Sequence, residues 1–288
     1  MAVARVRAET LAAEALTPIR ETLSHMGSRP DLPPLTGIAP GLIVADQRGW
    51  TRATDVVSGA AIDDLLDAAA QRWHAAPHAA AALAFKHYAY WLALPAVLGY
   101  ATVARVPLMR PDAVLLRWSA EKPFIQVGLA PGLAQARRGP DAATGRGGIT
   151  VAVLPADPLL LHGVGRGIRV VPHDDALLDE LRTALMEEHL TPVLAHIRSR
   201  VHLGRRTLWG SLASGVAHGL SRAADVIPGP TIAAAEAVLT TLGVRDLVSV
   251  GERTGGGLAV QRHTCCLAFT LPEPHRKVCS GCCIPAGG

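Results

Sequence analysis

Residues 77–104 read PHAAAALAFKHYAYWLALPAVLGYATVA, a long and nearly uncharged stretch that decides the architecture of the chain. Its alanines and leucines favour a helix, and the proline that opens it suits the first helical turn, where its missing N–H has no intrahelical partner. Residues 88–104 carry no charge over seventeen positions, which is the lower limit for crossing a bilayer. Pro95 and Gly99 interrupt this run. We therefore expect a helix over about residues 78–99, kinked at Pro95 and buried in a protein core rather than in a membrane.

Helical patterns also dominate the chain on both sides of this stretch. Apolar residues recur with helical spacing in five further segments: 1–26, 54–73, 173–200, 205–227 and 230–242. Asp174 or Asp175 is expected to cap the third of these helices, because a short carboxylate accepts hydrogen bonds from free backbone amides. Residues 31–41 contain three prolines and are expected to be irregular.

Four short segments between the helical halves have the composition of β-strands. They are rich in β-branched residues, are separated by Gly, Pro and Asp, and cover residues 113–118, 123–129, 148–154 and 167–171. The order of helices, strands and helices predicts an α+β fold rather than alternating βα units. We expect a mostly helical protein with a small central antiparallel sheet and an irregular C-terminal tail.

The composition excludes several classes of protein. Apolar residues make up 49% of the chain and charged residues only 18%, so the chain is not intrinsically disordered. Aromatic residues contribute 4%, which leaves Ala, Leu and Val to form the core and favours closely packed helices. A net charge of +4, scattered along the sequence, does not supply the basic face that binds nucleic acid. Charged residues such as Arg5, Arg7 and Glu9 interrupt the N-terminal segment, so we expect no export signal and a cytoplasmic location.

All five cysteines lie within the last twenty-four residues of the 288-residue chain. Cys265 and Cys266 are adjacent. After a spacer of twelve residues, Cys279 and Cys282 form a C-x-x-C pair that is followed by Cys283. A disulfide framework would distribute an even number of cysteines, so this cluster indicates a metal site in a reducing compartment. Four thiolates suit zinc or an iron–sulfur cluster. Neighbouring side chains diverge, so the adjacent pair favours the two metal positions of a two-iron cluster over zinc.

This tail is expected to form a unit of its own. We divide the chain into a mixed α+β domain, residues 1–258, and a C-terminal metal-binding segment, residues 259–288. Five basic side chains are expected to surround the thiols: Arg262, His263, His275, Arg276 and Lys277. Each alone is expected only to solvate the tail, and together they would attract an anionic partner.

The spacing C-C…C-x-x-C at the C-terminus resembles the cytoplasmic ferric siderophore reductases of the FhuF type, which bind a [2Fe–2S] cluster through such a tail. Residues 205–220 (RRTLWGSLASGVAHGL) and 73–96 are similar to helical stretches of the same family. The resemblance implies that the cluster ligands are four thiolates: Cys265, Cys266, Cys279 and Cys282. The spacer is two residues longer than in the family, Ser211 replaces a frequent Asn, and Cys283 is an alternative fourth ligand.

The resemblance implies a [2Fe–2S] oxidoreductase that transfers one electron to a ferric siderophore. Iron(III) binds hard oxygen donors much more strongly than iron(II) does, so a single electron releases the metal. The expected partners are a ferric siderophore of the hydroxamate type and an electron donor, with peripheral association at the inner face of the membrane as an option, but not nucleic acid. One alternative is a non-redox, siderophore-related binding protein with structural zinc in the tail. The other is a membrane-embedded partner of an uptake system, which would use residues 88–104 as its span.

Overall fold

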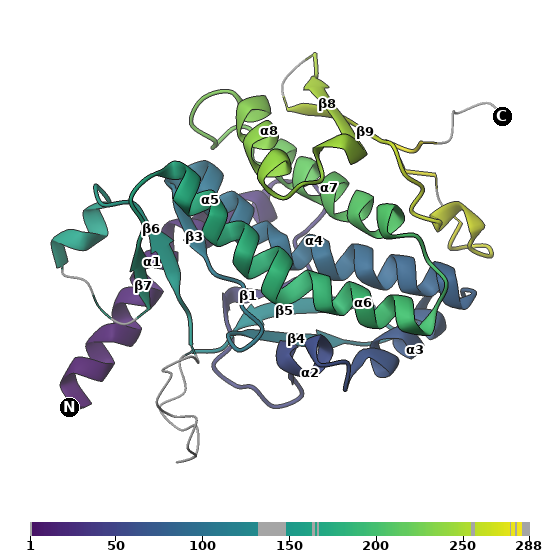
Figure 1. Cartoon of the computed structure of the whole chain (residues 1–288), viewed down its shortest axis with the longest axis horizontal. Helices are drawn as coiled ribbons and strands as arrows, with labels where there is room; N and C mark the ends of the chain where they lie inside the picture. Colours follow the sequence, from purple (N-terminus) through teal and green to yellow (C-terminus); the bar gives the residue numbers. More distant parts are fainter. Residues whose placement is uncertain are drawn as a thin grey trace.

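Helix α4 (Pro77–Val103) runs through the centre of the computed structural model (Figure 1). The structure describes residues 2–131, 148–162, 165, 167–254, 257–276, 278–279 and 281–283. Around α4 pack α1 (Ala2–Ser28), α3 (Ile62–Trp73) and α7 (Arg205–Arg222). Because α4 is surrounded, residues on all of its sides are buried, which explains why its sequence is apolar throughout.

Helix α4 was expected to end near Gly99 and instead continues to Val103. It passes through Pro95 and ends at Ala104, which has a left-handed φ of 50°. Gly99 is therefore not a stop signal. A Cβ at this position would overlap the carbonyl oxygen of Arg105 and the side chain of Ile19, so glycine allows α1 and the following strand to approach closely. Within the described part of the chain, no helix is both long and apolar enough to cross a membrane.

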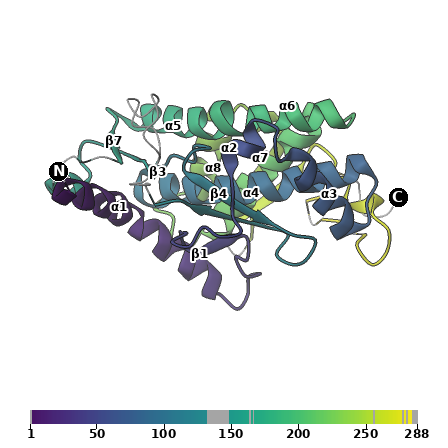
Figure 2. The same cartoon turned by 90° about the horizontal axis from the view of Figure 1, so that it is seen from below.

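The remaining helices follow the predicted segments with three corrections. The segment 54–73 contains two helices, α2 (Ala53–Val57) and α3, separated near Gly59 with its positive φ of 87°. The segment 173–200 is a helical rod in which a π-helical stretch, η3 (Thr183–Leu190), joins α5 (Asp174–Arg182) to α6 (Thr191–Arg200) (Figure 2). The cap of this rod is His173, whose Nδ1 accepts from the amide of Ala176 at 3.2 Å, and not Asp174 or Asp175. Helix α8 (Thr231–Thr241) packs on α7.

The π-helical stretch holds a buried polar network against α4. His189 is fully buried, and its Nδ1 donates to the carbonyl oxygen of Met109 at 2.7 Å. Its Nε2 then accepts from the hydroxyl of Tyr88 at 2.6 Å. Burial lowers the pKa of His189 to about 4, so the imidazole is neutral and can form both bonds.

The α+β class is confirmed, but the expectation of one antiparallel sheet is wrong. All four predicted segments are strands: β4 (Val114–Trp118), β5 (Ile125–Leu129), β6 (Val151–Val153) and β7 (Ile168–Val170). They belong to two mixed sheets. The first has the order β1-β5-β4-β2 and its β1–β5 pair is parallel; the second has the order β3-β6-β7 and its β6–β7 pair is parallel. The strands added to them are β1 (Ile38–Ile43), β2 (Thr51–Arg52) and β3 (Arg105–Pro107).

Strand β1 overlaps the proline-rich segment that was expected to be irregular. It lies at the edge of the first sheet, and its register with β5 shifts between Ile38 and Ile43. Pro40 is exposed within it. An edge position with an irregular register tolerates a residue that cannot donate a ladder hydrogen bond.

A two-stranded hairpin leads into the cysteine tail. It consists of β8 (Val248–Glu252) and β9 (Leu258–Arg262). Strand β9 packs on α7. Three short 3-10 turns complete the described elements: η2 (Pro158–His162), η4 (Arg245–Leu247) and η5 (Ala268–Thr270). Figure 1 shows the tail at the end of the molecule opposite the N-terminus.

Candidate functional site

The C-x-x-C turn folds back on strand β9 and is bonded to it. The amide of Arg262 donates to the carbonyl oxygen of Gly281 at 3.0 Å, and Nε2 of Gln261 donates to the carbonyl oxygen of Cys282 at 2.6 Å. The amide of Cys282 donates to the carbonyl oxygen of Cys279 at 3.0 Å and closes the turn. The second cysteine group is therefore held next to the strand that delivers the first.

Gly281 makes this contact possible through its size. Its φ is not in the left-handed region, so the turn does not need glycine for its backbone conformation. A Cβ at this position would instead overlap the carbonyl oxygen of Val260 on β9. Glycine is therefore needed here for close approach to β9, although a C-x-x-C turn would be expected to use it for conformational freedom.

Helix α7 holds the loop that carries the first cysteine pair. A Cβ at Gly210 would overlap the side chain of Thr264, which immediately precedes Cys265. The guanidinium of Arg262 is buried, and it donates to Oγ of Ser211 at 3.0 Å and to the carbonyl oxygen of Thr264 at 3.1 Å. Because a buried cation needs such acceptors, this pair of bonds connects the middle of α7 to the cysteine loop.

The five cysteines differ in their degree of exposure. Cys266 is buried, with 4% of its surface exposed, and its sulfur accepts a hydrogen bond from the thiol of Cys279. Cys265, Cys282 and Cys283 are half-buried. The sulfur of Cys265 accepts from the backbone amide of Leu267 at 3.2 Å.

Charges around the thiols show that the two groups are close together. Burial opposes ionisation of Cys266, but the cation of Lys86, the amide of Ala268 and Arg262 together lower its pKa. Burial and the adjacent charge of Cys266 raise the pKa of Cys279 to about 11. The pKa of Cys265 is raised by burial and then by the other thiols, including those of the C-x-x-C group.

The structure thus brings the four predicted ligands into one neighbourhood. The direct contact that it shows between the two groups is the bond of Cys266 with Cys279. Among the described residues, no three His, Cys, Asp or Glu side chains converge closely enough to hold a single metal ion.

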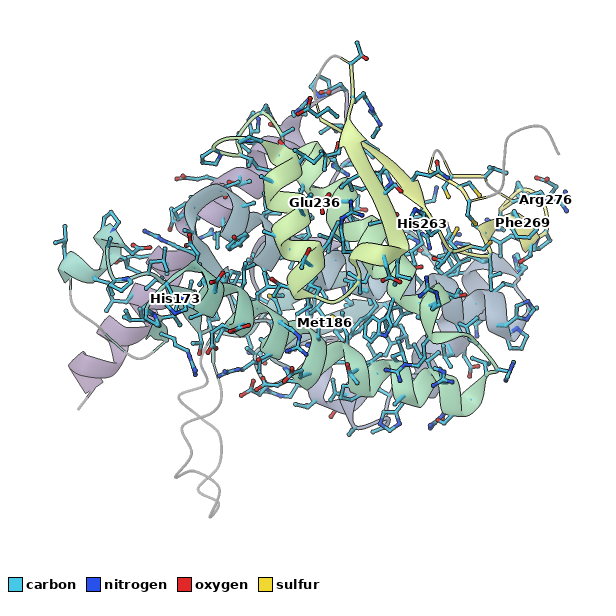
Figure 3. All side chains as sticks on the ribbon, turned by 45° about the horizontal axis from the view of Figure 1, so that its top comes forward. His173, Met186, Glu236, His263, Phe269 and Arg276 are labelled. Carbon is cyan, nitrogen blue, oxygen red and sulfur yellow. The ribbon has the colours of Figure 1, made fainter. Side chains whose placement is uncertain are left out.

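The basic residues expected around the thiols lie in different places. Arg262 lies at the site, whereas His263 turns away and its nitrogens bond to Ser249 Oγ and to the carbonyl oxygen of Asp246, at 2.7 and 2.8 Å. Figure 3 shows His263 on the hairpin, and Phe269 and Arg276 together at the far end of the tail. The ring of His275 lies 5.9 Å from that of His74 at the end of α3, and Lys277 lies outside the described residues.

Lys86 is the functional candidate that the sequence did not reveal. It projects from α4 and its charge acts on the thiols of both Cys266 and Cys279. It also lines a cleft of about 970 Å³ between α4, α7, the segment that follows α1 (residues 29–33) and the β8–β9 hairpin. The signal that sequence reasoning missed is a lone lysine inside an otherwise apolar helix.

Comparisons with known proteins give no assignment. No family model matches the chain, and no curated protein is similar to it. The likeness to FhuF-type reductases therefore remains a resemblance of the residues quoted above.

Proposed function

We propose that the protein is a cytoplasmic ferric siderophore reductase whose tail binds a [2Fe–2S] cluster through Cys265, Cys266, Cys279 and Cys282. The observation that carries this proposal is the adjacency of two features. The thiols of two chain segments lie together at one end of the molecule, and they share Lys86 with a cleft large enough for a small chelate.

The donor set fits such a cluster better than it fits a single ion. A two-iron cluster takes two thiolates at each iron, and the chain offers two thiols from each of two segments. The neighbourhood also supplies what thiolates need. A backbone amide donates to Cys265, and the charges acting on Cys266 are the cations Lys86 and Arg262 rather than carboxylates. When bound, the cluster would supply a low-potential one-electron donor.

The chain's own residues supply the binding and the electrostatics. Lys86 and Arg262 offset the negative charge of the thiolates, and the buried position of Cys266 keeps water away from one ligand. The hydrogen bonds between β9 and the C-x-x-C turn hold the second ligand pair in register with the first. These interactions would leave the half-buried cysteines on the side open to partners.

The reaction needs one electron and no nucleophile or proton relay. An external electron donor would deliver the electron through the tail, and the ferric ion of a bound siderophore would be reduced to the ferrous ion. Ferrous iron binds oxygen donors weakly, so it would leave the chelate. Hydroxamate siderophores, expected from the resemblance, belong to this class of oxygen-donor chelates.

The test is metal analysis and spectroscopy of the full chain purified without oxygen. We expect about two irons and two acid-labile sulfides per chain, and an electron paramagnetic resonance signal after reduction with dithionite. Reduced protein should release ferrous iron from a ferric siderophore, measured with a ferrous-specific chelating dye. Zinc without sulfide would refute the proposal in favour of a structural metal in the tail.

A further inference from the structure

The cleft beside the cysteine tail has the size and lining of a small-molecule site. Its volume of about 970 Å³ lies within the range of pockets that enclose ligands. Tyr90, Ser214 and His218 line it together with charged side chains. The walls come from α4, α7, the segment that follows α1 and the hairpin, whose arrangement can be followed in Figure 1.

The charge of this lining is unbalanced. Among the described lining residues, four side chains are cationic and two are carboxylates. Both carboxylates are paired with Arg29, which lies 2.6 Å from an oxygen of Asp31 and 3.1 Å from an oxygen of Asp225. The other three cations form no ion pair with a carboxylate in the part of the chain that the structure describes: Lys86, Arg222 and Arg253.

Two further observations describe the surroundings of these cations. The guanidinium of Arg222 donates to the carbonyl oxygen of Pro33, and its Nε is buried and has no hydrogen-bond partner. Burial, followed by the charges of Lys86 and of arginines that include Arg253, lowers the pKa of His218.

We infer that this cleft binds an anionic ferric chelate, with carboxylate or catecholate oxygens directed at Lys86, Arg222 and Arg253, in preference to a neutral hydroxamate chelate. Three monoanionic hydroxamates balance the charge of iron(III), so their complex is neutral. Catecholate and citrate complexes retain negative charge that the unpaired cations would attract. The anionic chelate would be the substrate class of the proposed reductase, and the interpretation of the cleft as a substrate site rests on that function.

The test uses gallium(III) complexes, because gallium(III) has the charge and size of iron(III) but does not accept an electron under these conditions. Binding of the full chain to three complexes would be measured by calorimetry: tris-catecholate, citrate, and neutral tris-acetohydroxamate. We expect the two anionic complexes to bind at least about tenfold more tightly than the neutral one, since charge-assisted hydrogen bonds are the stronger kind. Their affinity should fall with added salt.

Matched variants locate the binding. Arg253→Gln should weaken both anionic complexes by about tenfold, the loss of one hydrogen bond to a charged group, and leave the neutral complex unchanged. Arg48→Gln removes the same charge from an exposed side chain that does not line the cleft, and should change nothing. Lys86→Gln provides a second test if Arg253→Gln alters the thermal unfolding of the protein.

Three results would overturn the inference: equal binding of the neutral complex, equal binding of citrate or catechol without metal, or no effect of both cleft variants. These outcomes are separate from failure of the proposed function. A protein that binds the anionic gallium complexes but reduces no ferric chelate refutes the reductase alone. A working reductase that prefers neutral chelates refutes only the inference about charge.

Discussion

Substitution of Gly281 by alanine tests whether docking of the C-x-x-C turn on β9 assembles the site. The added methyl group would overlap the carbonyl oxygen of Val260, so the turn must move away from the strand. Two hydrogen bonds depend on this contact, from the amide of Arg262 to Gly281 at 3.0 Å and from the side chain of Gln261 to Cys282 at 2.6 Å. Each contributes about 0.5–1.5 kcal/mol, so docking should weaken by about 1–3 kcal/mol.

The effect should be local, because the turn lies outside the core that surrounds α4. We expect the midpoint of global unfolding to change little, since peripheral segments open independently of the core. Ligand positions are far less tolerant, because metal–ligand distances are fixed within about 0.2 Å. Gly281→Ala should therefore bind much less than half of the wild-type iron and sulfide.

Two readouts separate docking from metal binding. Hydrogen exchange of the Arg262 amide in metal-free protein should become about 5-fold to 150-fold faster, which corresponds to the same loss of docking energy. Gly251→Ala is the matched control, because it lies in the same hairpin and a Cβ there meets no atom within 4 Å. The reasoning is wrong if Gly281→Ala exchanges at the wild-type rate and loads the same amount of iron as the control.

Three further predictions concern the thiols and the core. Cys265→Ser should abolish the visible absorbance of the reconstituted cluster, whereas Cys283→Ser should retain most of it; equal losses would show that the ligand assignment is wrong. Lys86→Gln should raise the pKa of Cys266 and slow its alkylation by iodoacetamide in metal-free protein, by about tenfold for each unit of pKa, whereas Lys86→Arg should alkylate as the wild type does. Burial lowers the pKa of His189 to about 4, so the unfolded chain takes up a proton below its ordinary pKa of 6.5 that the folded chain does not. The free energy of unfolding should thus fall by about 2 kcal/mol from pH 7 to pH 5 because of this residue. Urea titrations of His189→Gln at the two pH values should not show this part of the decrease.

The sequence was most informative where one local rule determined the outcome. The helices and the four central strands were predicted because their periodicity and composition report burial directly. Pro40 misled because tertiary context outweighed its local preference. The edge position of β1 leaves the missing N–H of Pro40 without consequence.

The thiol group could be predicted for a different reason, since all of its members lie within a short piece of chain. The cleft could not be predicted, because its lining comes from α4, α7, the hairpin and the segment that follows α1, which only folding brings together. No single residue in the sequence indicated the cleft. Lys86 reads as one charge in an apolar helix, and Arg253 as one of many scattered arginines.

The position of Lys86 gives a physical reason for placing a cleft next to a thiol cluster. Its single charge acts on thiols on one side and lines the cleft on the other, so it lowers the energy of negative charge in both places. An anion in the cleft and thiolates in the tail would otherwise repel each other across a poorly screened region of the protein. A cation between them reduces that repulsion without closing the distance over which an electron must pass. A reductase of anionic chelates needs both conditions at once, whereas a structural zinc site would need no cation on the side of the cleft.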